Sequence, residues 1–167
     1  MTLVGRDRPG IVAHLSSALY EGGCNLGETS MMRLGGNFTI MMMVDFAGAA
    51  KGLADLCGPV ADSLGLHYHV DRIEGHLHQH LEPDVRITVY GADRAGIVSQ
   101  VTGALAQAGL HILDLESDVA GTDEKPIYVM HIEGHAAEGI DALRSALAVV
   151  AGEGVDVHLT PTETMIG

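Results

Sequence analysis

The sequence contains one eight-residue pattern twice, as GRDRPGIV from Gly5 and as GADRAGIV from Gly91. The similarity extends over residues 5–30 and 91–116, which share nine identical residues at a constant offset of 86 positions. A repeat of this length in a chain of 167 residues predicts two copies of one small module. We therefore expect one supersecondary unit, used twice, to determine the fold.

The division of the chain follows from this repeat. We predict a first domain over residues 1–74, a linker over residues 75–83 and a second domain over residues 84–167. We also expect the two domains to pack together as a pseudo-dimer. A sheet with helices on only one face has edges and a second face left to cover.

Each copy shows the same order of hydrophobic periods. In the second copy, residues 85–90 alternate between apolar and polar as in a strand, and apolar residues then recur at helical spacing from Ile97 to Ala108. Two strand-like runs, a second helical face and a last strand follow, and the first copy repeats this order. The order βαββαβ predicts an α+β fold of two ferredoxin-like modules, each an antiparallel sheet with helices on one face.

The first copy carries two local irregularities. Pro59 lies within its second helical pattern, and proline removes a backbone donor, so we expect a kink or a break there. Only the four residues MTLV precede Gly5, whereas the second copy has six or more strand residues before Gly91. The first strand is therefore predicted to be short or to begin upstream of these residues.

The net charge of −13 limits the partners of the chain. Both halves carry more acidic than basic residues, so neither offers a basic surface for nucleic acid or for an anionic membrane. The N-terminal residues lack the apolar core of a signal peptide, and no apolar run reaches the roughly 18 residues of a membrane span. Cys24 and Cys57 allow one disulfide, but buried free thiols are favoured. We expect a cytoplasmic protein that binds neither nucleic acid nor membrane directly.

The repeated pattern has the residues of a turn between a strand and a helix. Gly5 permits a tight turn or a close approach of the backbone. Asp7 and Asp93 are placed to cap the helices, accepting from the amides of Gly10 and Gly96 respectively. The free amides and the positive end of such a helix favour an anion, such as the carboxylate of an amino acid. The pattern equally fits a capped turn that binds nothing, and it lacks the signature of a nucleotide-binding loop.

Residues 5–26 and 91–113 resemble the opening strand, loop and helix of ACT domains, small regulatory modules that sense amino acids. The resemblance implies an effector amino acid at an interface between ACT modules, near the loop after the first strand and the start of the second strand. Carried over residue by residue, it implies ligand-binding positions in both copies: Gly5, Asp7, Gly10, Ile11 and Asn25 in the first, and Gly91, Asp93, Gly96, Ile97 and His111 in the second.

Two tandem copies with no appended enzyme or helix-turn-helix resemble the glycine cleavage system transcriptional repressor group. This resemblance implies a non-enzymatic regulatory protein, expected to be a homodimer, that signals to a protein partner or an enzyme. His111 replaces Asn25 and Ala95 replaces Pro9 in the second copy, so we expect that copy to bind a different ligand or none. The alternative is a structural or assembly module, or a regulatory subunit of an enzyme, whose loops no longer bind ligand.

The histidines are the remaining candidates for chemistry. His67 and His69 share one strand face, and three more histidines alternate through the linker at positions 76, 78 and 80. Alternating imidazoles can hold Zn²⁺ or Ni²⁺, but the run is short and has no companion cysteine, so we expect no physiological metal site. The pattern of serines and carboxylates gives no sign of catalysis. We therefore predict no enzyme activity and no cofactor.

Overall fold

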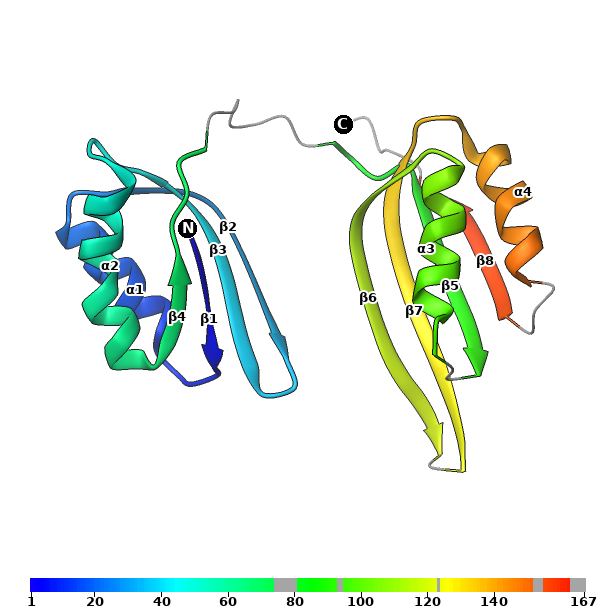
Figure 1. Ribbon diagram of the computed structural model, residues 1–167, viewed down its shortest axis with the longest axis horizontal. Coiled ribbons are helices and arrows are strands. Elements are labelled where there is room, and N and C mark those ends of the chain that lie inside the picture. Colours follow the sequence, from blue (N-terminus) through cyan, green and yellow to red (C-terminus); the bar gives the residue numbers. More distant parts are fainter. Residues whose placement is uncertain (74–80, 93–94, 123, 152–154, 163–167) are drawn as a thin grey trace. The chain divides into compact units, whose positions relative to one another are not determined.

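The computed structural model describes residues 1–73, 81–92, 95–122, 124–151 and 155–162 (Figure 1). The chain divides into two compact units, Met1–His76 and Leu77–Gly167. The first unit contains six elements, namely β1 (Thr2–Arg6), α1 (Ile11–Glu21), β2 (Asn25–Leu34), β3 (Asn37–Asp45), α2 (Ala50–Leu64) and β4 (Leu66–His69). The packing of the two units as a pseudo-dimer stays a prediction.

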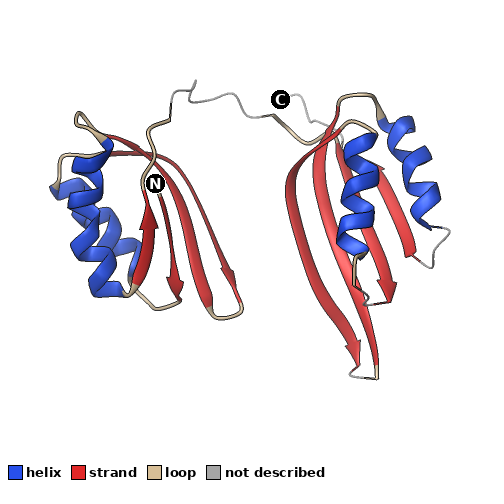
Figure 2. Ribbon diagram, viewed as in Figure 1, coloured by secondary structure: helices blue, strands red, loops and turns tan. Residues whose placement is uncertain are grey.

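The second unit has the same order of elements. They are β5 (Val85–Ala92), α3 (Ile97–Gln107), β6 (Leu110–Thr122), β7 (Lys125–Ala136), α4 (Ile140–Ala151) and β8 (Val155–Pro161). The strand orders are β2-β3-β1-β4 and β6-β7-β5-β8, and every neighbouring pair is antiparallel. In each unit both helices cover one face of the sheet (Figure 2). The predicted α+β fold of two ferredoxin-like modules is confirmed.

The strand register separates a buried face from an open face in each sheet. Leu3 of β1 lies opposite Ile40 of β3, and both side chains are buried beneath the helices. Side chains alternate along a strand, so Val4, which follows Leu3, points to the open face. In the second unit Val89 and Met130 form the equivalent buried pair. Each module therefore has its own hydrophobic core on the helix side of its sheet.

Two local predictions need correction. Of the predicted kink or break at Pro59, the break is wrong, since α2 continues from Ala50 to Leu64 with Pro59 inside it, and the kink stays a prediction. Pro59 is exposed, and the carbonyl of Asp55 that loses its partner is on an exposed residue that water can reach. The buried Leu53, Cys57 and Ala61 hold the other side of the helix against the sheet. The repeat pattern also does not begin after the strand, because Gly5 lies within β1 and pairs with Phe38 and Leu66.

Burial makes the core cysteines sensitive to alkaline pH. Both cysteines are free and buried, as predicted. Cys57 is 0 % exposed, and burial, with a smaller contribution from Cys24, raises its pKa from 9.0 to about 11. The folded state therefore holds this proton more tightly than the unfolded state does. The resulting stabilisation is complete below pH 9 and is lost as the pH rises to 11.

We expect the free energy of unfolding to fall across this window, by up to on the order of 2 kcal/mol from Cys57 alone. Urea unfolding curves at pH 8, 9, 10 and 11 measure this change. The Cys57→Ala variant should start from a lower stability, because it leaves a small cavity, but should lose less between pH 9 and 11. Equal slopes for the two proteins would rule out the buried thiol as the cause.

Candidate functional site

The loop between β1 and α1 places the start of the helix at Gly10. Gly10 is the N-cap and has φ 88°, a left-handed conformation that favours glycine, and no side chain caps the helix. The prediction that Asp7 is the cap is wrong. The Asp7 carboxylate forms an ion pair with Arg33 of β2, and the Asp7 amide donates to the carbonyl of Gly36, 3.0 Å away. The left-handed turn at Gly10 separates the helix start from Asp7 by three residues.

The other residues before Gly10 fasten the loop to the module. The Arg8 guanidinium donates to the carbonyl of Leu64 at the last residue of α2. A Cβ atom at Gly5 would lie 2.8 Å from the carbonyl oxygen of Gly65 and 2.7 Å from a methyl group of Leu66. The expected close approach of the backbone at Gly5 is therefore confirmed, but the backbone that approaches it belongs to the protein.

His14 lies directly beside the helix start. Its Nδ1 atom is 2.7 Å from the carbonyl oxygen of Gly10, which also accepts from the His14 amide at 3.0 Å. A carbonyl can only accept, so Nδ1 carries the proton of this bond and a neutral His14 leaves Nε2 as an acceptor. From the sequence alone, His14 is expected to be a surface or rim residue and not a catalytic base. Its helical spacing of four from Gly10 was the signal that it would reach this turn.

The first turn of α1 presents unused backbone donors. Among the described residues, the amides of Ile11, Val12 and Ala13 donate to no protein acceptor. No acidic side chain lies in this first turn. Free amides and the positive end of the helix dipole together make this a position where an anion is stabilised. The side chain of Ile11 is buried in the core, so Ile11 can contribute only its backbone.

Asn25 does not join this group of residues within one module. It is the first residue of β2, which follows the C-terminal end of α1 and lies opposite Asp45 at the end of β3. An eleven-residue helix is about 16 Å long, so Asn25 and Gly10 lie at opposite ends of the module. One amino acid cannot contact both in the same module. The helix predicted between the two residues already implied this separation, but the family resemblance grouped them at one site.

The second module repeats the backbone of the loop but changes its side chains. Gly91 lies within β5, and Gly96 is the N-cap of α3 with φ 90°. Ile97 is buried, and Gln100 occupies the place of His14. Asp93 lies outside the described residues.

His111 lies near the other end of the second module, as Asn25 does in the first. It is exposed on β6, opposite His135 of β7. The Nδ1 atom of His135 is 2.9 Å from a carboxylate oxygen of Asp84, whose other oxygen accepts from the amide of Ala136. The two modules therefore carry different side chains both at the helix start, with His14 in one and Gln100 in the other, and at the opposite end, with Asn25 in one and His111 in the other.

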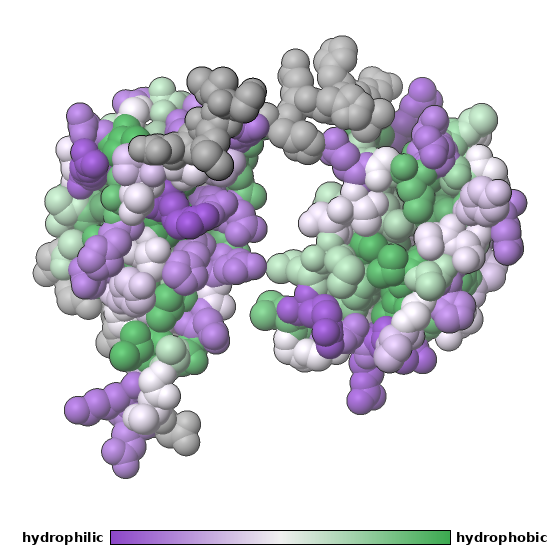
Figure 3. Space-filling model, turned by 180° about the vertical axis from the view of Figure 1, so that it is seen from behind, coloured by the Kyte–Doolittle hydropathy of each residue, from purple (hydrophilic) through white to green (hydrophobic). Residues whose placement is uncertain are grey.

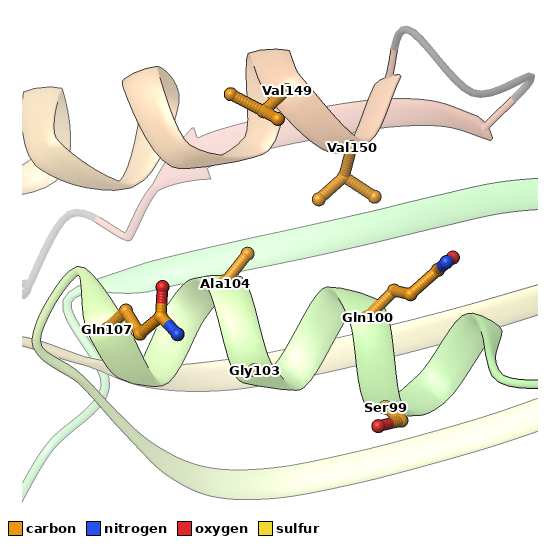
Figure 4. A pocket seen from close by; sticks show the side chains of 7 residues that line it. All are labelled: Ser99, Gln100, Gly103, Ala104, Gln107, Val149 and Val150. Atoms are coloured by element: carbon orange, nitrogen blue, oxygen red, sulfur yellow. The ribbon is translucent and has the colours of Figure 1, made fainter.

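A groove lined by residues of α3 and α4 lies in the second module (Figure 4). It has a volume of about 350 Å³ and runs between α3 and α4. Its lining consists of Ser99, Gln100, Gly103, Ala104, Gln107, Val149 and Val150. The groove includes Ser99 in the first turn of α3 and Gln100 directly after it, so a ligand at that helix start would have a hydroxyl and one amide side chain beside it.

The described residues hold no cluster of three or more histidine, cysteine, aspartate or glutamate side chains that could bind a metal ion. His69 contacts Asp71, with 2.7 Å between its Nε2 atom and the carboxylate. The linker histidines at 76, 78 and 80 lie outside the described residues. Within the described part of the chain, no helix is both long and apolar enough to cross a membrane.

The repeated fold and the repeated helix start define a protein of two ferredoxin-like modules. A family comparison matches residues 1–70 and 84–158 to the ACT domain. The chain therefore belongs to the ACT domain family. The resemblance to this family that the sequence suggested is confirmed.

Relatives of both the whole chain and a single module exist. Over 145 residues, the chain is 24% identical to the glycine cleavage system transcriptional repressor of Escherichia coli, covering 85% of this chain and 76% of the repressor. A UPF0237 protein of Listeria monocytogenes is 36% identical over 78 residues, which are 44% of this chain and 86% of that protein. The crystal structure of a protein from Galdieria sulphuraria has a TM-score of 0.79 and 27% identity, covering 97% of this chain and 96% of that one.

Proposed function

We propose that this chain is a non-enzymatic regulatory protein that binds an amino acid at the N-terminus of α1 and signals to a protein partner. The observation that carries the proposal is the helix start at Gly10. Within the described part of the chain, three consecutive amides there have no protein acceptor, and the first turn of α1 contains no acidic side chain. These amides suit the carboxylate of an amino acid, and an unprotonated His14 Nε2 suits its ammonium group. Membership of the ACT family and the relationship to a transcriptional repressor support the same function.

Asn25 enters this site only if a second module supplies it. Asn25 begins β2, which is an edge strand of the sheet of its own module. Its amide can both donate and accept, so it suits the end of an amino acid that the helix start does not hold. We therefore assign Asn25 to an effector site at an interface between modules, as the resemblance to the family implies.

The signal would pass to a protein rather than to DNA. The chain carries a net charge of −13, so its overall field repels the phosphate backbone. A regulator with this charge would act on transcription or on metabolism by contacting another protein.

The alternative function is that of a structural or assembly module without a ligand. The contacts of Asp7 and Arg8 favour it, because both side chains hold the loop against its own module and are not free for an effector. In that case the free amides of α1 would bind only water.

A thermal unfolding screen of the full chain against the twenty amino acids separates the two functions. A ligand of the native state at a hundredfold excess over its Kd stabilises by about 2.7 kcal/mol, about 10 °C or more for a module of this size. We expect one amino acid, or a few related ones, to raise the midpoint with rising concentration. A midpoint that stays constant with all twenty would favour the structural module.

A further inference from the structure

Two histidines lie opposite each other on the open face of the second sheet. His111 of β6 is paired with His135 of β7, and directly opposed residues of an antiparallel pair point to the same face, with Cβ atoms about 4.5–5.5 Å apart. The neighbouring pair, Leu110 and Ala136, is buried on the helix side, so the two imidazoles lie on the open side. Figure 3 shows mainly hydrophilic side chains on this sheet. The two imidazoles are therefore neighbours in hydrophilic surroundings.

Asp84 holds the ring of His135 in one orientation. The Nδ1 atom of His135 is 2.9 Å from one carboxylate oxygen of Asp84, and the other oxygen accepts from the amide of Ala136 at 2.9 Å. The amide of Asp84 donates to the carbonyl of Gly134 at 3.0 Å, so the backbone of Asp84 is also fixed. A carboxylate can only accept, so Nδ1 carries the proton of this bond and a neutral His135 keeps a lone pair on Nε2. Histidines that bind metal ions are usually held by a carboxylate in this way.

His135 differs in this respect from the other histidines that pair with a carboxylate in the described part of the chain. The Nε2 atom of His69 is 2.7 Å from Asp71, and the Nε2 atom of His158 is 3.7 Å from Asp156. In both of these pairs the nitrogen at the tip of the ring faces the carboxylate. Only in His135 does the carboxylate hold Nδ1 and leave the tip nitrogen for a ligand.

We propose that His111 and His135 bind a divalent transition-metal ion, with Asp84 as the residue that positions His135. Zn²⁺, Ni²⁺ and Cu²⁺ accept imidazole ligands, whereas Mg²⁺ and Ca²⁺ take oxygen ligands. Among the described residues, no third histidine, cysteine, aspartate or glutamate completes a metal cluster, so water fills the remaining coordination positions. The net charge of −13 attracts a cation. With two protein ligands we expect an exchangeable ion with micromolar affinity, bound more weakly than at a closed structural site.

The pair of imidazoles belongs to the second module alone. At the equivalent positions of the first module, Asn25 lies opposite Asp45, which offers an amide and one carboxylate in place of two imidazoles. The replacement of Asn25 by His111 therefore changes the class of ligand that this end of the module can take. The metal site is independent of the amino-acid site at the start of α1.

Calorimetric titration of the full chain with Zn²⁺ tests the proposal. The parent protein for this test has glutamine at the linker positions 76, 78 and 80, so that the linker histidines cannot contribute. We expect one ion per chain, and His111→Gln or His135→Gln should weaken its binding at least about tenfold. The control His131→Gln removes a histidine of the same face that lies beside Thr88, and should bind within about twofold of the parent. A parent that binds no Zn²⁺ up to about 1 mM, or a His131→Gln variant weakened as much as His111→Gln, would overturn the proposal.

Asp84→Asn tests the positioning role separately. An asparagine can still accept from the amide of Ala136, but its NH₂ group would then donate to Nδ1 of His135 and move the ring proton to Nε2. We expect Zn²⁺ affinity to fall by about 10- to 100-fold, and ¹⁵N spectra of the metal-free protein to show the Nε2–H tautomer of His135. A purely structural role of Asp84 would lower the melting temperature without this change of tautomer. An Asp84→Asn variant that keeps the Nδ1–H tautomer and the affinity of the parent would contradict the positioning role.

Discussion

Replacing Gly5 with valine is expected to unfold the first module at temperatures where the wild type is folded. The Cβ atom would lie 2.8 Å from the carbonyl oxygen of Gly65 and 3.2 Å from the Cα atom of Leu66. Both contacts are with backbone, which cannot turn aside as a side chain can, so β1 and β4 must separate. We expect a loss of about 3 kcal/mol or more, and a melting temperature lowered by more than about 10 °C.

Circular dichroism and calorimetric melting of the full chain measure this loss. A matched control of opposite sign is Gly103→Ala, since a Cβ atom there meets no other heavy atom within 4 Å and alanine favours a helix. This control should stabilise α3 by about 0.5–1 kcal/mol. If the melting temperature of Gly5→Val equals that of the wild type, Gly5 is not required for the pairing of β1 with β4.

The repeat was enough to predict the fold because it fixed the unit that the chain uses twice. The hydrophobic periods then gave the type of each element. Where boundaries differed, tertiary contacts were the cause. Pro59 stays helical because three neighbouring side chains are buried on the opposite side of α2. Gly5 belongs to β1 because its pairing with Phe38 and Leu66 extends the strand past the start of the repeated pattern.

The candidate site was only partly predictable, because local sequence does not show which conformation a glycine adopts. Aspartate is one of the residue types preferred as an N-cap, so Asp7, three residues before Gly10, was the predicted cap. In the structure the N-cap of α1 is Gly10, which has φ 88°. Asp7 was then free to pair with Arg33, a residue 26 positions away in another strand. Asn25 was grouped with Gly10 by resemblance, although the eleven-residue helix between them places them at opposite ends of the module.

The rows of residues on the open face of each sheet were not visible from the repeat. One such row in the first module is Ser30, Met41, Thr2 and His69, and the equivalent row in the second is Glu116, His131, Thr88 and His158. Each row comes from all four strands of a module, and the strand register decides which residues share it. Met41 and His131 therefore become equivalent positions only once the antiparallel pairs are known. The repeated segment ends before either residue in its copy, so sequence similarity did not align them.

An acidic side chain in the first turn of α1 should have opposite effects on stability and on binding. Ala13 is exposed, and Ala13→Glu places a carboxylate beside the free amides of Ile11, Val12 and Ala13. Its interaction with the helix dipole should stabilise the module by about 0.3–1 kcal/mol. The same carboxylate would occupy the donors that the effector needs and would repel its negative end. We expect the affinity for the amino acid to fall at least tenfold, as happens when a charged hydrogen bond of about 1.5–3 kcal/mol is lost.

Titration calorimetry with the amino acid found by the melting screen tests the proposed site most directly, using the wild type, Ala13→Glu and Ser99→Glu. Ser99 is the exposed equivalent of Ala13 in the first turn of α3 and lines the groove of the second module. We predict that Ala13→Glu melts at or above the wild-type temperature and binds at least tenfold more weakly, while Ser99→Glu binds within about twofold of the wild type. An Ala13→Glu variant that is stabilised but binds with wild-type affinity would contradict a site at the N-terminus of α1.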